Sequence, residues 1–88
     1  MLEIIETKQF AKDVSLLNRQ GKDMLKLKNI IILLAQEKPL LVRHRDHALT
    51  GNFVGRRSCH IEPDWILMYQ VQGKTLMLFR TGSHSNVY

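Results

Sequence analysis

The spacing of apolar residues predicts a strand and two helices in the first half of the chain. Residues 2–6 form a short β-branched run that suits a strand, and Thr7 can cap the helix that follows. A second helix is expected over residues 22–36, where apolar side chains are so frequent that most of this helix should be covered. The apolar stripes of both helices have the spacing of one helical face: Phe10, Val14, Leu17, Met24, Leu27, Ile31 and Leu34.

Polar residues mark the ends and the outer faces of these helices. Gly21 ends the first helix in the usual way, and Pro39 stops the second. With the apolar stripe turned inward, the side chains of Lys8, Lys12 and Asp13 are expected to face solvent. Two helices joined by a short glycine-containing link form an αα-hairpin, which needs another layer to cover its apolar faces.

The second half of the chain is predicted to be extended. After a loop over residues 40–50, strands are expected at residues 52–60 and 65–71, joined by a turn at residues 63–64. A last strand follows at residues 75–80. The last two strands are apolar on both faces, which places them at the centre of a sheet or between two covering layers.

These elements follow the order β-α-α-β-β-β, and residues 84–88 are left as a polar tail. We therefore expect an α+β fold with two N-terminal helices packed on one twisted, mostly antiparallel sheet of about four strands. A chain of 88 residues has room for one hydrophobic core, so residues 1–88 are expected to form a single domain.

The charge balance favours a polyanionic partner. Thirteen Lys and Arg residues against eight Asp and Glu residues give a formal net charge of +5, which suits nucleic acid, the ribosome or an acidic protein. The single cysteine, Cys59, cannot form an internal disulfide, which fits the reducing cytoplasm. The chain lacks the basic start of a signal peptide and any apolar run near the ~20 residues of a membrane span. We expect a cytoplasmic protein with no membrane segment.

All four histidines lie in the second half of the chain, mostly at the ends of predicted elements. Histidine is the side chain that can both take and give a proton near neutral pH. The histidines lack the spacing of known metal sites, there are no paired cysteines, and two arginines flank the loop histidines. Neither a metal nor another cofactor is therefore expected. The four histidines are His44, His47, His60 and His84.

Acid–base cleavage of RNA fits this inventory. RNA carries its own nucleophile, the 2′-hydroxyl, so an enzyme needs only a base, an acid and cations for the charge on the phosphate. His47, His60, Asp64 and His84 can divide the first two roles, and Arg80 can take the third. Arg80 could instead form a structural ion pair with Asp64. Cys59, which precedes His60, points to the opposite strand face and is expected in the core rather than as a nucleophile.

Nearby side chains could hold the RNA. Trp65 and Tyr88 are candidates for stacking on a base, and Arg56 and Arg57 for contacting phosphates. Trp65 equally suits a core position, and Tyr88 could fray at the end of the chain.

Three blocks of sequence together resemble a known family. They are Asp46–Gly51 (DHALTG), Cys59–Tyr69 (CHIEPDWILMY) and Arg80–His84 (RTGSH), and each contains a histidine. The helical segments Phe10–Asp13 (FAKD) and Asp23–Leu27 (DMLKL) fit as well. The chain resembles, over essentially its whole length, the YafQ-like branch of the RelE/ParE superfamily, which are toxins of bacterial type II toxin–antitoxin pairs.

This resemblance implies a RelE-like fold and a ribosome-dependent endoribonuclease. Active members of the family cut messenger RNA in the ribosomal decoding site, without metal, by 2′-hydroxyl attack that leaves a 2′,3′-cyclic phosphate. The implied partners are a cognate antitoxin, the ribosome and mRNA. Two other hypotheses stay open: a non-enzymatic ParE-like toxin that inhibits a protein such as DNA gyrase, and a plain basic RNA-binding module.

The matched positions also imply roles for particular residues. His84 falls where the family has its general acid, while the resemblance leaves the base open among His47, His60 and Asp64. Arg80 matches the position that stabilises phosphate charge. Trp65 lies beside these positions, and Tyr88 matches a C-terminal aromatic of the site. One departure concerns Ser58, because close relatives often have an activity-supporting acid there; Glu62 could substitute for that acid.

Overall fold

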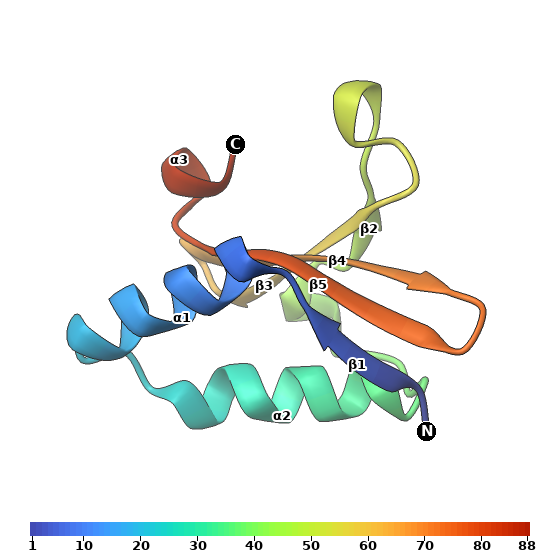
Figure 1. Ribbon diagram of the computed structural model, residues 1–88, viewed down its shortest axis with the longest axis horizontal. Coiled ribbons are helices and arrows are strands. Elements are labelled where there is room, and N and C mark those ends of the chain that lie inside the picture. The colour runs from blue at the N-terminus through green and yellow to red at the C-terminus, as the bar shows by residue number, and fades with distance from the viewer.

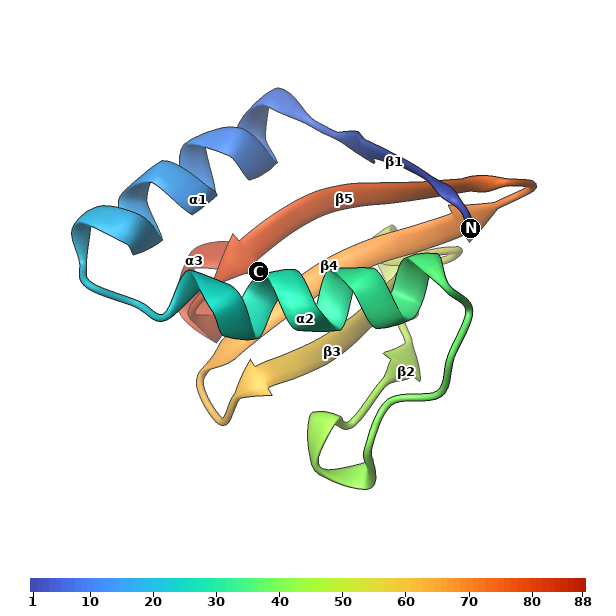
Figure 2. The same ribbon diagram turned by 90° about the horizontal axis from the view of Figure 1, so that it is seen from below.

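The computed structural model describes residues 1–88 as a mixed sheet with two long helices on one face and a short helix on the other (Figures 1 and 2). Two single-turn 3₁₀ segments, Val42–His44 and Gly51–Phe53, flank the shortest strand. The main elements are β1 (Glu3–Glu6), α1 (Lys8–Arg19), α2 (Met24–Ala35), β2 (His47–Ala48), β3 (Arg57–Glu62), β4 (Trp65–Gln72), β5 (Thr75–Gly82) and α3 (His84–Val87).

The sheet has five strands in the order β1-β5-β4-β3-β2. Strand β1 runs parallel to β5, and every other pair is antiparallel. The predicted mostly antiparallel sheet and the central position of β4 are therefore confirmed. The expected strand count was one too low, because the two-residue strand β2 lies within the predicted loop of residues 40–50. The predicted strand at residues 52–60 begins later, at Arg57, since Gly51–Phe53 is a 3₁₀ turn.

Helices α1 and α2 cover one face of the sheet, where the main hydrophobic core lies (Figure 2). Alternate residues of the strands point to this face, and they pack against the apolar stripes predicted for the helices. Helix α2 begins at Met24, later than the predicted start at residue 22, because Asp23 caps it by accepting a hydrogen bond from the Leu25 N–H at 3.0 Å. The buried core residues include Phe10, Leu17, Leu27, Ile30, Leu34, Cys59, Trp65, Leu67, Tyr69, Leu76 and Leu78.

A smaller apolar cluster lies on the opposite face, beneath α3 (Figure 1). Ile66 and Met68 of β4 pack there against Val87, which is 5% exposed. The expected polar tail was therefore wrong: residues 84–87 are helical because Ser83 caps them and Val87 anchors them. Gly82, with φ of +148°, supplies a backbone conformation that other residues rarely adopt where the chain leaves β5. None of the helices combines the length and the apolar character that a membrane span requires.

Candidate active site

Three of the four histidines line one open cleft on the sheet face that carries α3. This histidine cleft has a volume of about 730 Å³, and β2, β3, β4, α3 and the turn before β2 contribute to it. Residues more than thirty positions apart in the chain therefore meet at one site. The cleft is lined by Arg45, Asp46, His47, Leu49, Ser58, His60, Ile66, His84 and Tyr88.

Strand alternation puts His60 in the cleft and its neighbour in the core. Ser58 and His60 pair across the sheet with Met68 and Ile66, and they share the face that α3 partly covers. Cys59 points the other way and is completely buried. Burial raises the pKa of the Cys59 thiol to about 12, so it stays protonated and inert near neutral pH. The predicted core position of Cys59 is confirmed.

Backbone carbonyls determine the protonation pattern of two cleft histidines. Nδ1 of His47 lies 2.7 Å from the Arg45 carbonyl oxygen, and Nδ1 of His60 lies 3.1 Å from that of Pro63. A carbonyl only accepts hydrogen bonds, so each Nδ1 carries the proton. In the neutral ring, Nε2 therefore keeps its lone pair. Each of these histidines thus has one nitrogen ready to accept a proton, as a general base requires.

His84 is held differently. Its ring packs against Tyr88, with centroids 4.8 Å apart, and Tyr88 in turn contacts the edge of Phe53 at 5.6 Å. No other group of the chain forms a hydrogen bond with the His84 ring, so both of its nitrogens are available to a ligand. The alternative that Tyr88 frays does not hold, because its N–H donates to the His84 carbonyl at 3.1 Å and Tyr88 lines the cleft.

Asp64 lies outside the histidine cleft but supports it. One carboxylate oxygen accepts the backbone N–H of His84 at 3.2 Å, close to the start of α3. A carboxylate at a helix start satisfies a backbone donor and interacts favourably with the helix dipole. The structure therefore gives Asp64 a contact with the backbone of the proposed acid.

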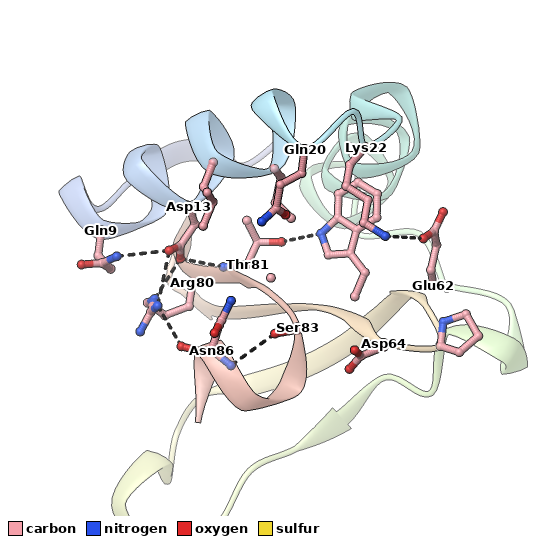
Figure 3. A pocket seen from close by; sticks show the side chains of 15 residues that line it. Gln9, Asp13, Gln20, Lys22, Glu62, Asp64, Arg80, Thr81, Ser83 and Asn86 are labelled. Atoms are coloured by element: carbon pink, nitrogen blue, oxygen red, sulfur yellow. Dashed lines mark hydrogen bonds and ion pairs between the residues drawn. The ribbon is translucent and has the colours of Figure 1, made fainter.

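Arg80 also lies outside the histidine cleft, in a neighbouring polar pocket (Figure 3). Its guanidinium forms two hydrogen bonds to Asp13, at 2.8 Å and 3.3 Å, so the alternative of an ion pair with Asp64 does not hold. The expectation that Asp13 faces solvent was wrong, because its residue is only 8% exposed. A carboxylate already offsets the charge of Arg80, which argues against a direct contact between Arg80 and phosphate.

Trp65 is part of the core rather than a stacking surface. Its residue is 1% exposed, and its indole N–H donates to the Thr81 hydroxyl at 2.9 Å. Lys22 lies over the ring with its ammonium 5.9 Å from the centroid. No face of the ring is open to an RNA base, so the predicted stacking role has no basis in this conformation.

The two predicted RNA-binding arginines are both engaged within the protein. The Arg56 guanidinium lies over the Phe79 ring at 3.9 Å, and the Arg57 Nε lies 3.3 Å from Asp46. Arg57 remains 41% exposed in its side chain. Neither residue lines the histidine cleft, so any contact with RNA would be made outside it.

Sequence reasoning left Asp46 out of the site. Its carboxylate accepts one hydrogen bond from the hydroxyl of Tyr69, a residue only 2% exposed, and another from the Arg57 guanidinium. Burial, and then the Asp46 carboxylate, raise the pKa of the Tyr69 phenol. These bonds tie the residue just before His47 to the centre of the sheet. The position of Asp46 next to the candidate His47 was the only sequence signal for a role in the site. Its hydrogen-bond partner Tyr69 lies 23 positions away in the chain, so that contact could not be predicted.

Ser58 lines the cleft where relatives were expected to have an acid, and it is only 1% exposed. Glu62, the suggested substitute, does not reach the cleft. It forms ion pairs with Lys26 at 2.8 Å and Lys22 at 3.4 Å, which lower the pKa of its carboxyl. No group of three or more His, Cys, Asp or Glu side chains has the geometry of a metal site.

The sequence matches a family of toxins over nearly its whole length. The family described as "Bacterial toxin of type II toxin-antitoxin system, YafQ" matches residues 2–88. The chain belongs to this family. The predicted membership of the YafQ-like branch is thereby confirmed, and with it the predicted fold class.

Relatives of the YafQ family share both sequence and structure with the chain. The mRNA interferase toxin YafQ of Escherichia coli K12 is 43% identical over 81 residues, covering 91% of this chain and 88% of the relative. A copper-bound mutant toxin from Helicobacter pylori superposes with a TM-score of 0.97 at 40% identity, with 100% of both chains covered. The E. coli DinJ–YafQ complex contains a chain that superposes with a TM-score of 0.92 at 40% sequence identity, covering 100% of this chain and 99% of that chain.

Proposed function

We propose that this chain is the toxin of a type II toxin–antitoxin pair and an endoribonuclease that cuts mRNA in the cytoplasm. A YafQ relative named as an mRNA interferase supports the reaction class. The observation that carries the proposal is the histidine cleft, which combines two histidines that have a free Nε2 with a third whose ring is unbonded. That set can accept and donate protons in one reaction.

The proposed reaction needs no metal. Nε2 of His60 or His47 takes the proton of the RNA 2′-hydroxyl, and the 2′-oxygen attacks the adjacent phosphorus. His84, which enters the step as the imidazolium with both ring nitrogens protonated, gives a proton to the departing 5′-oxygen as the P–O5′ bond breaks and becomes neutral. The products are a 2′,3′-cyclic phosphate and a free 5′-hydroxyl, so atoms and charges balance. Proton exchange with water then removes the extra proton from the base histidine and restores the proton of His84.

Arg45 is the cation best placed for the charge that builds on the phosphate. It lines the histidine cleft and has no carboxylate partner, in contrast to Arg80 and Arg57. It also adopts a left-handed backbone conformation, with φ of 47°, that is uncommon for a non-glycine residue. In this conformation the Arg45 carbonyl oxygen accepts the hydrogen bond from Nδ1 of the His47 ring. We infer that this turn holds both the cation and one candidate base.

The partners that we propose are mRNA on the ribosome and an antitoxin protein. The net charge of +5 favours association with RNA. A YafQ relative is found in a complex with the antitoxin DinJ. Here β1 is an edge strand that pairs only with β5, and it lies beside an apolar groove of about 490 Å³, which extends over α1 and α2. A free edge next to an apolar groove suits a partner that adds a strand and packs a helix.

Induction of the chain in bacteria, followed by mapping of mRNA 5′ ends, tests the proposed activity. We expect growth arrest and discrete in-frame cuts with the wild-type chain, and neither with a folded His84→Gln variant. Ser85→Ala, an exposed change on the same helix, is the matched control and should remain toxic. Growth arrest without cuts would support the ParE-like alternative, in which the toxin inhibits a protein such as DNA gyrase.

A further inference from the structure

Asp13 is a buried carboxylate in a helix that takes no direct part in the histidine cleft. It lies on α1, and its side chain is 9% exposed. Three groups of the chain donate hydrogen bonds to it: the Gln9 amide at 3.1 Å, the Arg80 guanidinium at 2.8 Å and 3.3 Å, and the Thr81 backbone N–H at 3.1 Å. A buried charge is tolerated when paired and bonded in this way. Asp13 thus fixes both the backbone and the side chain at the end of β5.

Arg80 passes this constraint on to α3. While its Nε and Nη2 bond Asp13, Nη2 also donates to the Asn86 carbonyl oxygen at 3.0 Å (Figure 3). Asn86 lies two positions after His84 on the same short helix. The guanidinium therefore connects α1 to the helix that carries the proposed general acid. An arginine can make this connection because its planar fork presents several donors at fixed angles.

Helix α3 depends on such external contacts for its position. It has four residues, far below the about 12 residues that an isolated helix needs even for marginal stability. Its contacts outside the helix are the Asp64 bond to the His84 N–H, the packing of Val87 and Tyr88, and the Arg80 bond. Without Asp13, the long Arg80 side chain has no partner that directs it toward Asn86.

We propose that Asp13 is a positioning residue for catalysis, which acts through Arg80 to hold α3 and thereby the ring of His84 in the histidine cleft. This inference rests on the function proposed above. It assigns Arg80 a mechanical role in place of direct phosphate contact, and it gives α1 a part in the reaction. Misplacing a catalytic group by about 1 Å can cost roughly 100-fold in rate, so a modest shift of α3 is sufficient for a large effect.

Two substitutions separate positioning from phosphate stabilisation. Asp13→Asn keeps the shape of the side chain but removes the charge that holds the guanidinium, and it leaves Arg80 free. If Arg80 acted on phosphate, this release would maintain or raise the cleavage rate. Arg80→Lys keeps the positive charge but cannot bridge Asp13 and Asn86 with one ammonium. If charge alone mattered, the lysine variant would stay active. Positioning predicts that both variants lose roughly 10- to 100-fold in rate.

The experiment measures initial rates of reporter-mRNA cleavage by each purified variant in a reconstituted bacterial translation system. Asp23→Asn is the matched control, because it makes the same chemical change on α2 where asparagine caps a helix as well as aspartate does. Its rate should equal that of the wild type. Circular dichroism of every variant at 25 °C checks that the fold is retained.

A second readout follows the position of α3 without relying on activity. In NMR spectra, nuclear Overhauser contacts between the Tyr88 ring and the Phe53 ring, which lies outside α3, should be present in the wild type and in Asp23→Asn. They should be lost or weakened in Asp13→Asn and Arg80→Lys. Unchanged ring contacts in both folded variants, or full cleavage by Arg80→Lys, would overturn the proposal. If Asp13→Asn does not fold, Arg80→Lys alone decides between these outcomes.

The two proposals fail in different ways. Should His84→Gln cleave mRNA normally, the proposed function fails, while the ring contacts still report whether Asp13 positions His84. Should His84→Gln be inactive but Asp13→Asn and Arg80→Lys be fully active, the function stands and the positioning role is wrong.

Discussion

The bond between Tyr69 and Asp46 offers a quantitative test of how the sheet supports the site. Tyr69→Phe removes one hydroxyl from a side chain that is 2% exposed and leaves the ring in the core. A hydrogen bond to a charged group contributes about 1.5–3 kcal/mol. The Asp46 side chain is 29% exposed and keeps its Arg57 partner, so water can replace part of the loss. We therefore expect a cost near the lower limit, about 1.5 kcal/mol.

For a domain of this size, that loss lowers Tm by about 6–12 °C. Urea unfolding followed by circular dichroism measures the free energy, and a thermal scan measures Tm. Tyr88→Phe is the matched control, because the same hydroxyl is removed from a 42% exposed residue that has no hydrogen bond through it. The control should change stability by less than about 0.5 kcal/mol.

A double-mutant cycle isolates the pair itself. Tyr69→Phe and Asp46→Asn, alone and together, should give a coupling of about 1 kcal/mol. Because Asp46 directly precedes His47, both single variants should also cleave mRNA more slowly. Additive effects with no coupling, or a Tyr69→Phe variant as stable as the control, would refute the reasoning.

Further predictions concern pH, metal and antitoxin binding. The buried Cys59 thiol has a pKa of about 12, above its value of ~8.5 in an unfolded chain, so its contribution to stability is complete below pH ~8.5 and is lost as pH rises toward 12. Between pH 8 and 10.5 the wild type should lose about 2.5 kcal/mol more than Cys59→Ala in urea unfolding, and equal losses in the two proteins would contradict a buried Cys59 thiol with a raised pKa. Dialysis of the purified protein against EDTA, followed by its return to the Mg²⁺ buffer of the translation system, should leave mRNA cleavage unchanged, whereas a loss that copper or another transition metal restores would overturn the metal-free mechanism. Ile4→Glu at the exposed β1 edge should weaken antitoxin binding in calorimetry and leave toxicity intact; unchanged affinity would exclude this edge as the docking site.

Periodicity predicted the parts of the fold that local rules govern. The stripe that includes Phe10 and Leu17 determines which face of α1 is buried, and the apolar runs of β4 and β5 place these strands inside the sheet. The two-residue strand β2 has too few residues for any period, so only its pairing with β3 reveals it. Val87 looked like part of a polar tail because its apolar partners, Ile66 and Met68, lie about twenty residues earlier.

The residue types of the candidate site could be predicted from the sequence, but the contacts between its side chains could not. We predicted His47, His60 and His84 as site residues from the concentration of histidines in the second half of the chain and from the three sequence blocks. These three histidines do share a cleft. The partners of charged residues were not predictable. Asp13 carries the same charge as a solvent-facing helix residue, and only the fold brings Arg80 to it from 67 positions away. Long-range ion pairs leave no local signal in sequence.

The chemical ends of the RNA products distinguish cleavage by 2′-hydroxyl attack from other routes of RNA hydrolysis. Reporter mRNA cut by the purified chain in a translation system is analysed by mass spectrometry of its 3′ ends. We expect a 2′,3′-cyclic phosphate with the wild type, also after the purified protein has been dialysed against EDTA and returned to the Mg²⁺ buffer of the translation system, and no cleavage by a folded His84→Gln variant. A 3′-hydroxyl product, or the same cyclic product at an undiminished rate from His84→Gln, would contradict acid–base catalysis by the histidine cleft.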